Sequence, residues 1–184
     1  MLDLKEHFPN LKLSLFTIPF DMQYEGVHQF RIMRDQKLKK LKENLDWIQI
    51  IPHGLSHMPR EFVNADRVTT KLALKSIDEA FKKDGIPYQK GFKAPFWLWN
   101  QNVVDVLNEE GWFGATDRNQ PNMLKPKINY IYNWDISEPF PENEPVVKGH
   151  GHMTPPSLNN LEDCFMNLLK MPTDAEFKFV TNVL

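Results

Sequence analysis

The sequence predicts an α/β domain with a largely parallel sheet or barrel, and three observations support this prediction. Short β-like runs alternate with amphipathic helical runs along the whole chain, as they do in folds whose parallel strands are joined by helices. The chain has 184 residues, which is enough for one domain with a sizeable core. No repeat or linker divides it. We therefore expect residues 1–184 to form a single domain.

A helix tail, two strands and one helix are expected in the first third of the chain. The segment LKEHFP is typical of the end of a helix, and the run LKLSLFTIP at residues 11–19 predicts a strand because leucine alternates in it. Residues 35–45 place leucines on one face among lysines and predict a basic helix. Residues 47–52, WIQIIP, form a second β-like run that should be buried.

Two capped helices flank a third strand in the middle of the chain. Asp66 is expected to cap a long helix that ends before Gly85, and Asn100 to cap a shorter one that ends before Gly111. Between them, residues 88–96 predict a strand that leads into FKAPFWLWN. The apolar faces of the two helices are expected to consist of Leu74, Ile77 and Phe81 in the first and Val103, Val104 and Leu107 in the second.

The last third supplies the remaining strands and one helix. Strands are predicted at residues 113–116, 129–136, 145–150 and 177–184. Ser157 is expected to cap the last helix, with Leu158, Leu161, Phe165 and Leu168 facing inward and Cys164 as a core residue. In parallel α/β folds the chemistry gathers at the C-terminal ends of the strands. The residues at or near such ends are His53, Pro95, Asp135 and His150.

Composition excludes several classes of function and partner. The net charge of −2 lacks the excess of positive charge that is typical of nucleic-acid-binding proteins. One basic helix face, formed by Lys37, Lys39, Lys40 and Lys42, is typical of a solvated surface. No apolar run approaches the roughly 20 residues that span a bilayer, and the N-terminus lacks the order of a signal peptide. A single cysteine fits a reducing compartment. We expect a cytoplasmic protein that binds neither nucleic acid nor membrane.

His53 and His57, in IIPHGLSHMP, form the most specific feature of the sequence. They stand four positions apart directly after a predicted buried strand, so that two imidazoles are delivered to one point at the rim of a sheet or barrel. Two converging imidazoles are a common start to a Zn²⁺ site, which needs a third protein ligand and leaves a position open for water. The structural alternative is that one histidine caps a turn and the other lies on the surface.

The motifs around these strand ends resemble those of the polysaccharide deacetylases, the NodB-homology carbohydrate esterases. HGLSH at residues 53–57 keeps both histidines of the family's His-Ser/Thr-x-x-His motif. Residues 93–96, KAPF, stand in the place of its Arg-x-Pro-Tyr motif, with lysine for arginine and phenylalanine for tyrosine. Trp134 and Asp135 correspond to the Asp and Trp of a further motif, although the spacing is not matched. VVKGHGH, at residues 146–152, matches an apolar strand that ends in histidine.

The resemblance implies an irregular (β/α) barrel and a metal-dependent hydrolase that removes acetyl groups from a carbohydrate. It implies a divalent metal, with zinc expected, held by His53 and His57, and a catalytic acid at His150 or His152. Residues 150 and 152 share a face if the strand continues, and a bend at a neighbouring glycine would leave only one facing the metal. The implied substrate-binding residues are Lys93, Pro95, Phe96, Trp97, Trp134 and Asp135. Core packing is the competing interpretation for the two tryptophans.

One departure from the family bears on activity. The family's first motif, Thr-Phe-Asp-Asp, supplies a catalytic base and a metal ligand on a strand before the first strand seen here. Only about ten residues precede the predicted strand at residues 11–19. We therefore expect the strand of the Thr-Phe-Asp-Asp motif, with both of its aspartates, to be absent. The alternative is that Asp21 serves instead. Asp135 and Glu25 are the carboxylates that we consider as substitutes.

Three hypotheses remain open from the sequence. The first is a deacetylase that acts on an acetylated carbohydrate. The second is a catalytically inactive carbohydrate- or metal-binding relative; an unpaired edge left by a missing strand would favour a homodimer. The third is an unrelated α/β domain in which HGLSH is a structural turn, and it predicts that His53, His57 and His150 lie more than roughly 10 Å apart, too far to share one ion.

Overall fold

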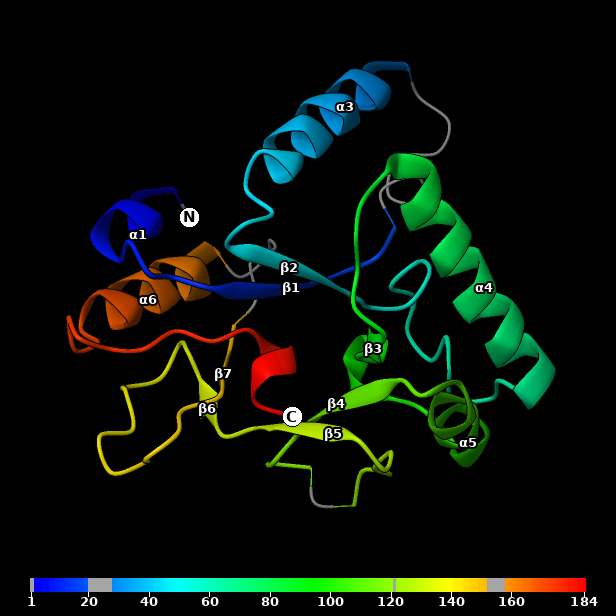
Figure 1. Cartoon of the computed structure of the whole chain (residues 1–184). Helices are drawn as coiled ribbons and strands as arrows, with labels where there is room; N and C mark the ends of the chain where they lie inside the picture. The colour runs from blue at the N-terminus through cyan, green and yellow to red at the C-terminus, as the bar shows by residue number, and fades with distance from the viewer. Residues whose placement is uncertain (1, 20–27, 121, 152–157) are drawn as a thin grey trace.

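A computed structural model of the chain describes residues 2–19, 28–120, 122–151 and 158–184 (Figure 1). The α-helices are α1 (Leu2–His7), α3 (His28–Lys42), α4 (Arg67–Asp84), α5 (Gln101–Glu110) and α6 (Leu158–Leu169). The strands are β1 (Leu13–Thr17), β2 (Ile48–Pro52), β3 (Gly91–Phe92), β4 (Phe113–Asp117), β5 (Asn129–Tyr132), β6 (Trp134–Asp135) and β7 (Gly149–His150). Two short 3₁₀ turns are η1 (Pro95–Trp97) and η2 (Val180–Asn182).

All strand pairs in the described residues are parallel, which confirms the predicted α/β class. They form three separate sheets, with β1 beside β2, then β3, β4 and β5 in order, then β6 beside β7. Backbone hydrogen bonds bridge the first two sheets, from Gln89 N–H to Ile50 O (2.9 Å) and from Lys93 N–H to Pro52 O (3.2 Å). No closed sheet exists among the described strands, so the predicted barrel is present only as these consecutive parallel pieces.

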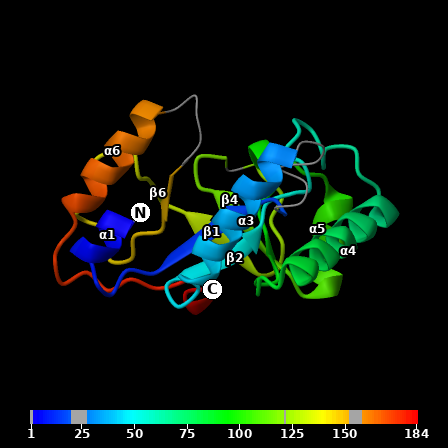
Figure 2. The same ribbon diagram turned by 90° about the horizontal axis from the view of Figure 1, so that it is seen from above.

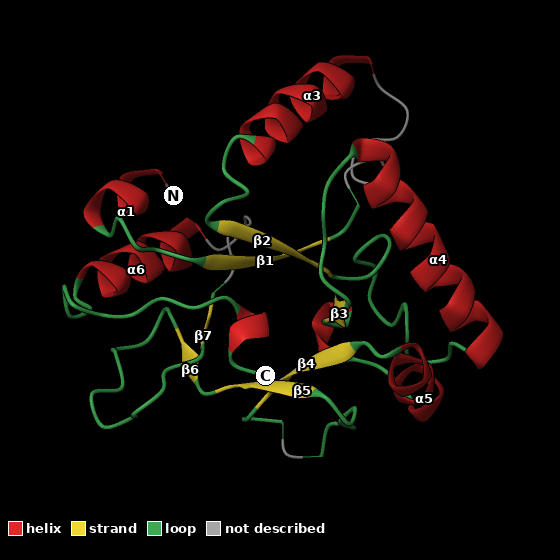
Figure 3. Ribbon diagram, in the orientation of Figure 1, coloured by secondary structure: helices red, strands yellow, loops and turns green. Residues whose placement is uncertain are grey.

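The strands lie around a central region and the helices lie outside them (Figure 1). The view from above places α1 and α6 on one side of the strands and α4 and α5 on the other (Figure 2). The segment that carries η2 returns to the centre, between the sheet of β1 and β2 and the strands β4 and β5 (Figure 3). Among the described helices, none is both long and apolar enough to cross a bilayer.

The caps of α4 and α5 confirm the two helix starts predicted from the sequence. The side chain of Asp66 accepts a hydrogen bond from Thr69 N–H (2.7 Å), and that of Asn100 accepts one from Val103 N–H (3.2 Å). Each satisfies a backbone donor that the first helical turn leaves without a partner. The apolar face of α4 is buried as predicted, with Ile77 and Phe81 fully buried.

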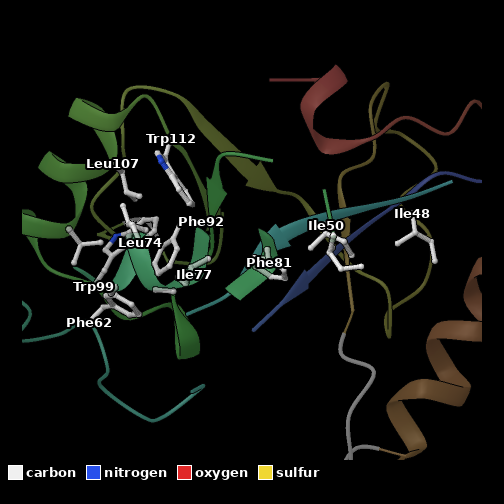
Figure 4. Close-up of a cluster of buried hydrophobic side chains, with 14 of the residues drawn as sticks. Ile48, Ile50, Phe62, Leu74, Ile77, Phe81, Phe92, Trp99, Leu107 and Trp112 are labelled. Carbon is white, nitrogen blue, oxygen red and sulfur yellow. The ribbon is translucent and has the colours of Figure 1, made fainter. Parts of the chain in front are cut away.

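Two buried clusters lie on opposite faces of the strands. The larger cluster packs α4 and α5 against the outer faces of β2 and β3, and includes Ile50, Phe62, Leu74, Phe92 and Leu107 (Figure 4). The smaller cluster fills the central region and consists of Ile51, Phe113, Ala115, Tyr130, Tyr132 and Val180. Because side chains alternate along a strand, β2 contributes Ile50 to one cluster and Ile51 to the other.

Several predicted elements are shorter than expected. The strand predicted at residues 88–96 is limited to Gly91–Phe92, because Pro95 lacks a backbone N–H and begins η1. The strand predicted at residues 129–136 breaks at Asn133, whose N–H donates to Lys148 O (3.1 Å). Residues 145–150 form a strand only at Gly149–His150.

The helix α3 starts before the predicted residue 35 and ends at Lys42. The predicted strand at residues 177–184 is wrong: Val180 N–H donates to the Ser14 hydroxyl (3.0 Å) instead of to another strand, and the chain then turns through η2. Cys164 is buried, as predicted, and burial raises the pKa of its thiol. The proposed cap Ser157 lies outside the described residues.

Candidate functional site

Five polar or aromatic side chains lie at the C-terminal ends of neighbouring strands. They are His53 after β2, Lys93 after β3, Asp117 at the end of β4, Tyr132 at the end of β5 and His150 at the end of β7. Parallel strands bring these ends to one edge of the fold. The contacts described below show that most of these side chains meet there.

His53 is held in one orientation by the backbone of the next strand. Its Nδ1 lies 2.8 Å from the carbonyl oxygen of Lys93, and because a carbonyl only accepts, Nδ1 must carry the proton of this hydrogen bond. The neutral ring then has its lone pair on Nε2. This is the arrangement in which an outer hydrogen bond fixes the tautomer of a metal-binding histidine. The side chain of His53 is buried.

His57 lies beside His53 on a tightly folded loop. The two ring centroids are 4.8 Å apart. His57 has a positive φ of 57°, a conformation that is uncommon for a residue with a Cβ atom. The loop has no room for a side chain at residue 54: a Cβ on Gly54, whose φ is +81°, would lie 2.7 Å from Pro95 and 2.9 Å from Glu61.

Glu61, which lies outside the HGLSH motif, forms hydrogen bonds to the backbone of that loop. Its carboxylate accepts hydrogen bonds from the backbone N–H groups of Leu55 (2.8 Å) and Ser56 (3.3 Å). Burial raises the pKa of Glu61, and these two N–H groups and the nearby His57 oppose that rise. The carboxylate therefore acts as a fixed clamp on the backbone between the two histidines.

The turn after β3 presents two aromatic side chains in strained backbone conformations. Phe96 and Trp97 have φ values of 56° and 62°, and left-handed backbone at such residues costs roughly 1–3 kcal/mol each. Phe96 is 49% exposed, with its ring 5.1 Å from that of His57. Strain of this kind clusters at functional sites, so that the turn is a candidate part of the site.

Lys93 joins this turn to His150. Its Nζ lies 2.9 Å from Nε2 of His150 and 4.3 Å from the centre of the Trp97 ring. Lys93 is only 4% exposed. Burial lowers the pKa of its ammonium group to about 8, and the charge of Asp117 opposes this change. The ring of Trp97 lies 5.2 Å from that of His150.

Tyr132 contributes a buried hydroxyl to the same cluster. Its ring lies 4.8 Å from that of His150 and 5.5 Å from that of Trp97. The hydroxyl has no hydrogen-bond partner within the residues that the structure describes. Burial raises the pKa of this phenol well above its ordinary value, and the neighbouring Tyr130 and Asp117 raise it further.

The structure brings most of the predicted site residues together. His53 and His150 contact Lys93, His57 contacts Phe96, and buried Pro95 supports Gly54. All three histidines therefore contact residues 93–97. This contact pattern argues against the third hypothesis, in which the histidines lie far apart. The second candidate acid, His152, lies outside the described residues, as do Asp21 and Glu25.

Trp134 and Asp135 point to other partners. Trp134 is buried, donates its indole N–H to Glu138 O (3.1 Å) and packs at 5.3 Å against Phe140. This is the core-packing interpretation. Asp135 is opposite His150 in the register of β6 and β7, but its carboxylate accepts hydrogen bonds from the N–H (3.0 Å) and hydroxyl (2.7 Å) of Ser137. These hydrogen bonds and this ring contact all join Trp134 and the Asp135 carboxylate to residues outside the cluster.

The separation of the His53 and His57 rings is that of two imidazoles on one divalent ion. Two imidazoles that bind one ion through nitrogens at about 2.0–2.1 Å have ring centroids about 5 Å apart at a tetrahedral angle, and the observed separation is 4.8 Å. The described part of the chain contains no group of three or more His, Cys, Asp or Glu side chains placed to hold a metal ion. A catalytic site of this kind needs three protein ligands, and His53 and His57 are the two described side chains that could serve.

Asp117, Tyr132 and Glu61 were not among the residues selected from the sequence. Asp117 and Tyr132 end strands β4 and β5, and the strand-end argument that identified His53 applies equally to them. Glu61 carries no such signal, because its function depends on how the loop after β2 folds back on itself. The position of a side chain on a strand could be inferred from the sequence, whereas a clamp within a loop could not.

Comparisons with known proteins agree with the fold. No protein-family model matches the sequence, and no curated protein matches it. The Xyl-CE4 domain of a multidomain xylanase from the hindgut metagenome of Trinervitermes trinervoides matches 99% of this chain and 80% of that one, with a TM-score of 0.56 and 11% identity. This chain therefore shares the fold of that CE4 domain.

A second structure matches over a smaller part. It is a polysaccharide deacetylase candidate from Mycobacterium smegmatis, with 21% identity and a TM-score of 0.47. The match covers 62% of this chain and 35% of that protein. This chain thus spans about a third of the length of that protein.

Proposed function

We propose that this chain is a metal-dependent hydrolase that removes an acetyl group from a carbohydrate. The observation that supports the proposal most strongly is the meeting of His53, His57 and His150 around residues 93–97, at the C-terminal edge of parallel strands. The CE4-type fold is consistent with it. The strained turn at Phe96 and Trp97 lies at the same place, as does the Tyr132 hydroxyl, which has no hydrogen-bond partner among the described residues.

His53 and His57 would hold the divalent ion, which we expect to be zinc. When bound, such an ion lowers the pKa of a coordinated water and polarises the acetyl carbonyl. The contribution of the chain is to fix the two imidazoles: the Lys93 carbonyl sets the tautomer of His53, and Glu61 holds the loop that carries His57. The backbone N–H of Phe96 is the donor that we assign to the oxyanion of the tetrahedral intermediate.

His150 is the group that we assign as the general acid. Its Nε2 lies 2.9 Å from Lys93 Nζ, so that the lysine can supply a proton to the ring, and a proton on His150 would pass to the leaving oxygen or nitrogen of the sugar. Asp117 is the described carboxylate whose charge acts on Lys93 and Tyr132. We propose that Asp117 takes the proton of the attacking water, a task that requires a carboxylate close to the reacting centre.

Acetate release tests the proposal directly. The full chain would be supplied with Zn²⁺, and acetate would be measured from acetylated xylan and from N-acetylglucosamine oligomers. Release that a chelator stops and added metal restores is the expected result. If no acetate appears from either glycan while one ion per chain is bound, the proposed hydrolysis is overturned.

A second candidate function is a carbohydrate- or metal-binding relative without catalysis. The described residues contain no group of three or more His, Cys, Asp or Glu side chains placed to hold a metal ion, and this candidate requires none. Binding of an acetylated glycan with no turnover would support this candidate.

A further inference from the structure

The side chain of Lys93 approaches His150 at one particular ring nitrogen. The Lys93 Nζ atom lies 2.9 Å from Nε2 of His150, which is within hydrogen-bond distance. A lysine ammonium group has three donors and no acceptor, so that Nε2 must be the acceptor. A neutral imidazole has one nitrogen that accepts and one that carries the proton. In the neutral ring of His150 the proton therefore lies on Nδ1.

The surroundings of Lys93 support the charged form of its side chain. The Nζ atom lies 4.3 Å from the centre of the Trp97 ring, a distance at which the ring face attracts a cation. Burial lowers the pKa of Lys93 to about 8, and the charge of Asp117 opposes this change. The ammonium form therefore predominates at neutral pH, and the group that faces Nε2 is a donor.

Two aromatic rings hold the imidazole of His150 in place. The centre of the Trp97 ring lies 5.2 Å from that of His150, at an interplanar angle of 67°, and the Tyr132 ring lies at 4.8 Å and 54°. These two rings also contact each other, at 5.5 Å. Packing of this kind restricts rotation of the imidazole, whereas the hydrogen bond from Lys93 decides which nitrogen carries the proton.

Lys93 acts on His150 in the opposite sense to a carboxylate. A carboxylate accepts from a ring N–H and so keeps the proton on the nitrogen that it faces. Asp135 is the carboxylate opposite His150 in the register of β6 and β7, and it accepts hydrogen bonds from Ser137. A lysine donates, and the ring proton is then held on the nitrogen farther from it.

We propose that Lys93 is a positioning residue that holds His150 in the Nδ1–H tautomer and makes Nδ1 the atom that delivers the proton to the leaving group. The inference rests on the proposed function and deepens it, because it assigns the acid to one of two ring nitrogens. As the Nδ1–H bond breaks and the leaving oxygen or nitrogen gains that proton, a proton moves from Lys93 Nζ to Nε2. The imidazole stays neutral, and Lys93 becomes a neutral amine that regains its proton from water.

Nitrogen-15 NMR reads the tautomer of each histidine and requires no activity. Spectra of the metal-free full chain would be recorded at about pH 7, where an ordinary imidazole is mostly neutral. The signals of His150 are identified by their loss in His150→Gln. The wild type should carry the proton on Nδ1, and Lys93→Met, which removes the donor, should lose this preference. Lys93→Arg keeps a charged donor that has no acceptor and should retain it.

Two controls separate the tautomer of His150 from general changes in the site. The Nδ1 atom of His53 bonds to the backbone carbonyl of residue 93 (2.8 Å), which a side-chain substitution does not remove, so that His53 should keep its tautomer in every variant. Lys148 also lies over an aromatic ring, 5.0 Å from the centre of Tyr130, and Lys148→Met should leave His150 unchanged.

The same variants predict a division between kcat and KM. With an acetylated glycan and Zn²⁺, Lys93→Met should lower kcat by about 10–100-fold and leave KM unchanged, because the orientation of a reacting histidine depends on its hydrogen-bond partner. Lys93→Arg should recover most of the lost kcat. A role for Lys93 in folding alone would leave kcat per folded chain unaltered.

A wild-type His150 with its proton on Nε2 would overturn the inference, as would a tautomer that Lys93→Met leaves unchanged. The two proposals fail separately. Acetate release with equal kcat in the wild type and in Lys93→Met removes the positioning role and leaves the hydrolase. A tautomer that depends on Lys93, in a chain that releases no acetate, leaves the hold of Lys93 on His150 and removes the hydrolase.

Discussion

The side-chain nitrogen of Lys93 lies 2.9 Å from Nε2 of His150, across 57 residues of sequence. This bond joins the end of β3 to the end of β7, although the two strands belong to separate sheets. It places a buried ammonium group between the rings of Trp97 and His150.

Lys93 should make stability depend on pH in an alkaline window. The pKa of Lys93 falls from 10.5 to about 8 on folding because of burial. Above pH 8 the unfolded chain therefore binds more protons at this site than the folded chain, so that the free energy of unfolding contributed by Lys93 rises with pH up to about 10.5.

The substitution Lys93→Met should remove this rise, which is on the order of 3 kcal/mol at most. The measurement is urea unfolding of the wild type and of Lys93→Met between pH 7 and pH 10.5. The free energy of unfolding of the variant is subtracted from that of the wild type at each pH, because the tyrosines of both proteins also titrate near the upper end. The substitution Lys148→Met is the matched control, since Lys148 also lies over an aromatic ring, 5.0 Å from the centre of Tyr130. Parallel curves for the wild type and Lys93→Met would contradict the prediction.

Metal binding should depend on both members of the histidine pair. The substitutions His53→Ala and His57→Ala should each weaken Zn²⁺ binding by more than about tenfold, because each removes one of the two imidazoles that the described residues supply. Calorimetric titration with Zn²⁺ measures the effect, and elemental analysis gives the number of ions per chain. His7→Ala, at an exposed histidine on α1, should have no effect. Unchanged affinity in either site variant would show that the ion binds elsewhere.

Asp117 should matter for catalysis more than for folding. The substitution Asp117→Asn should reduce acetate release by about 10²–10⁴-fold if the carboxylate is the base. It should also lower the pKa of Lys93 further, because the charge of Asp117 raises that pKa. Two quantities are measured: kcat, and the pH at which the Lys93-dependent rise in the free energy of unfolding begins. If that pH changes and kcat does not, Asp117 acts on the charge of Lys93 but is not the catalytic base.

Glu61 should stabilise the HGLSH loop. Replacement by alanine leaves the backbone N–H groups of Leu55 and Ser56 without their acceptor, which should cost about 1–3 kcal/mol of stability and weaken Zn²⁺ binding at His57. The substitution Glu61→Gln keeps an acceptor oxygen and should cost less. Chemical unfolding and metal titration check both effects. Equal losses for the two variants would mean that the charge, and not the acceptor, is what the loop requires.

The sequence predicts best those elements whose signals are local. The helices α4 and α5 begin at Asp66 and Asn100 as predicted, because a capping side chain bonds to backbone three residues away. The strand at residues 177–184 fails because the partner of Val180 is the hydroxyl of Ser14, 166 residues distant. No pattern within the segment itself carries that information.

The same distinction applies to the candidate site. His53, His57 and His150 could be selected because each follows a predicted strand, and the strands converge. Trp134 also lies near the end of a predicted strand, yet it packs on Phe140 and bonds to Glu138. Which face of a two-residue strand a side chain occupies depends on neighbours that the sequence does not specify.

The position of Val180 in the central cluster has a consequence for how the chain is made. Val180 packs with Ile51, Ala115 and Tyr130, and each of these is synthesised before it. This cluster, which lies between strands far apart in the sequence, can therefore be completed in a nascent chain only after residue 180 has left the ribosome. Until then part of its apolar surface lacks one of its packing partners.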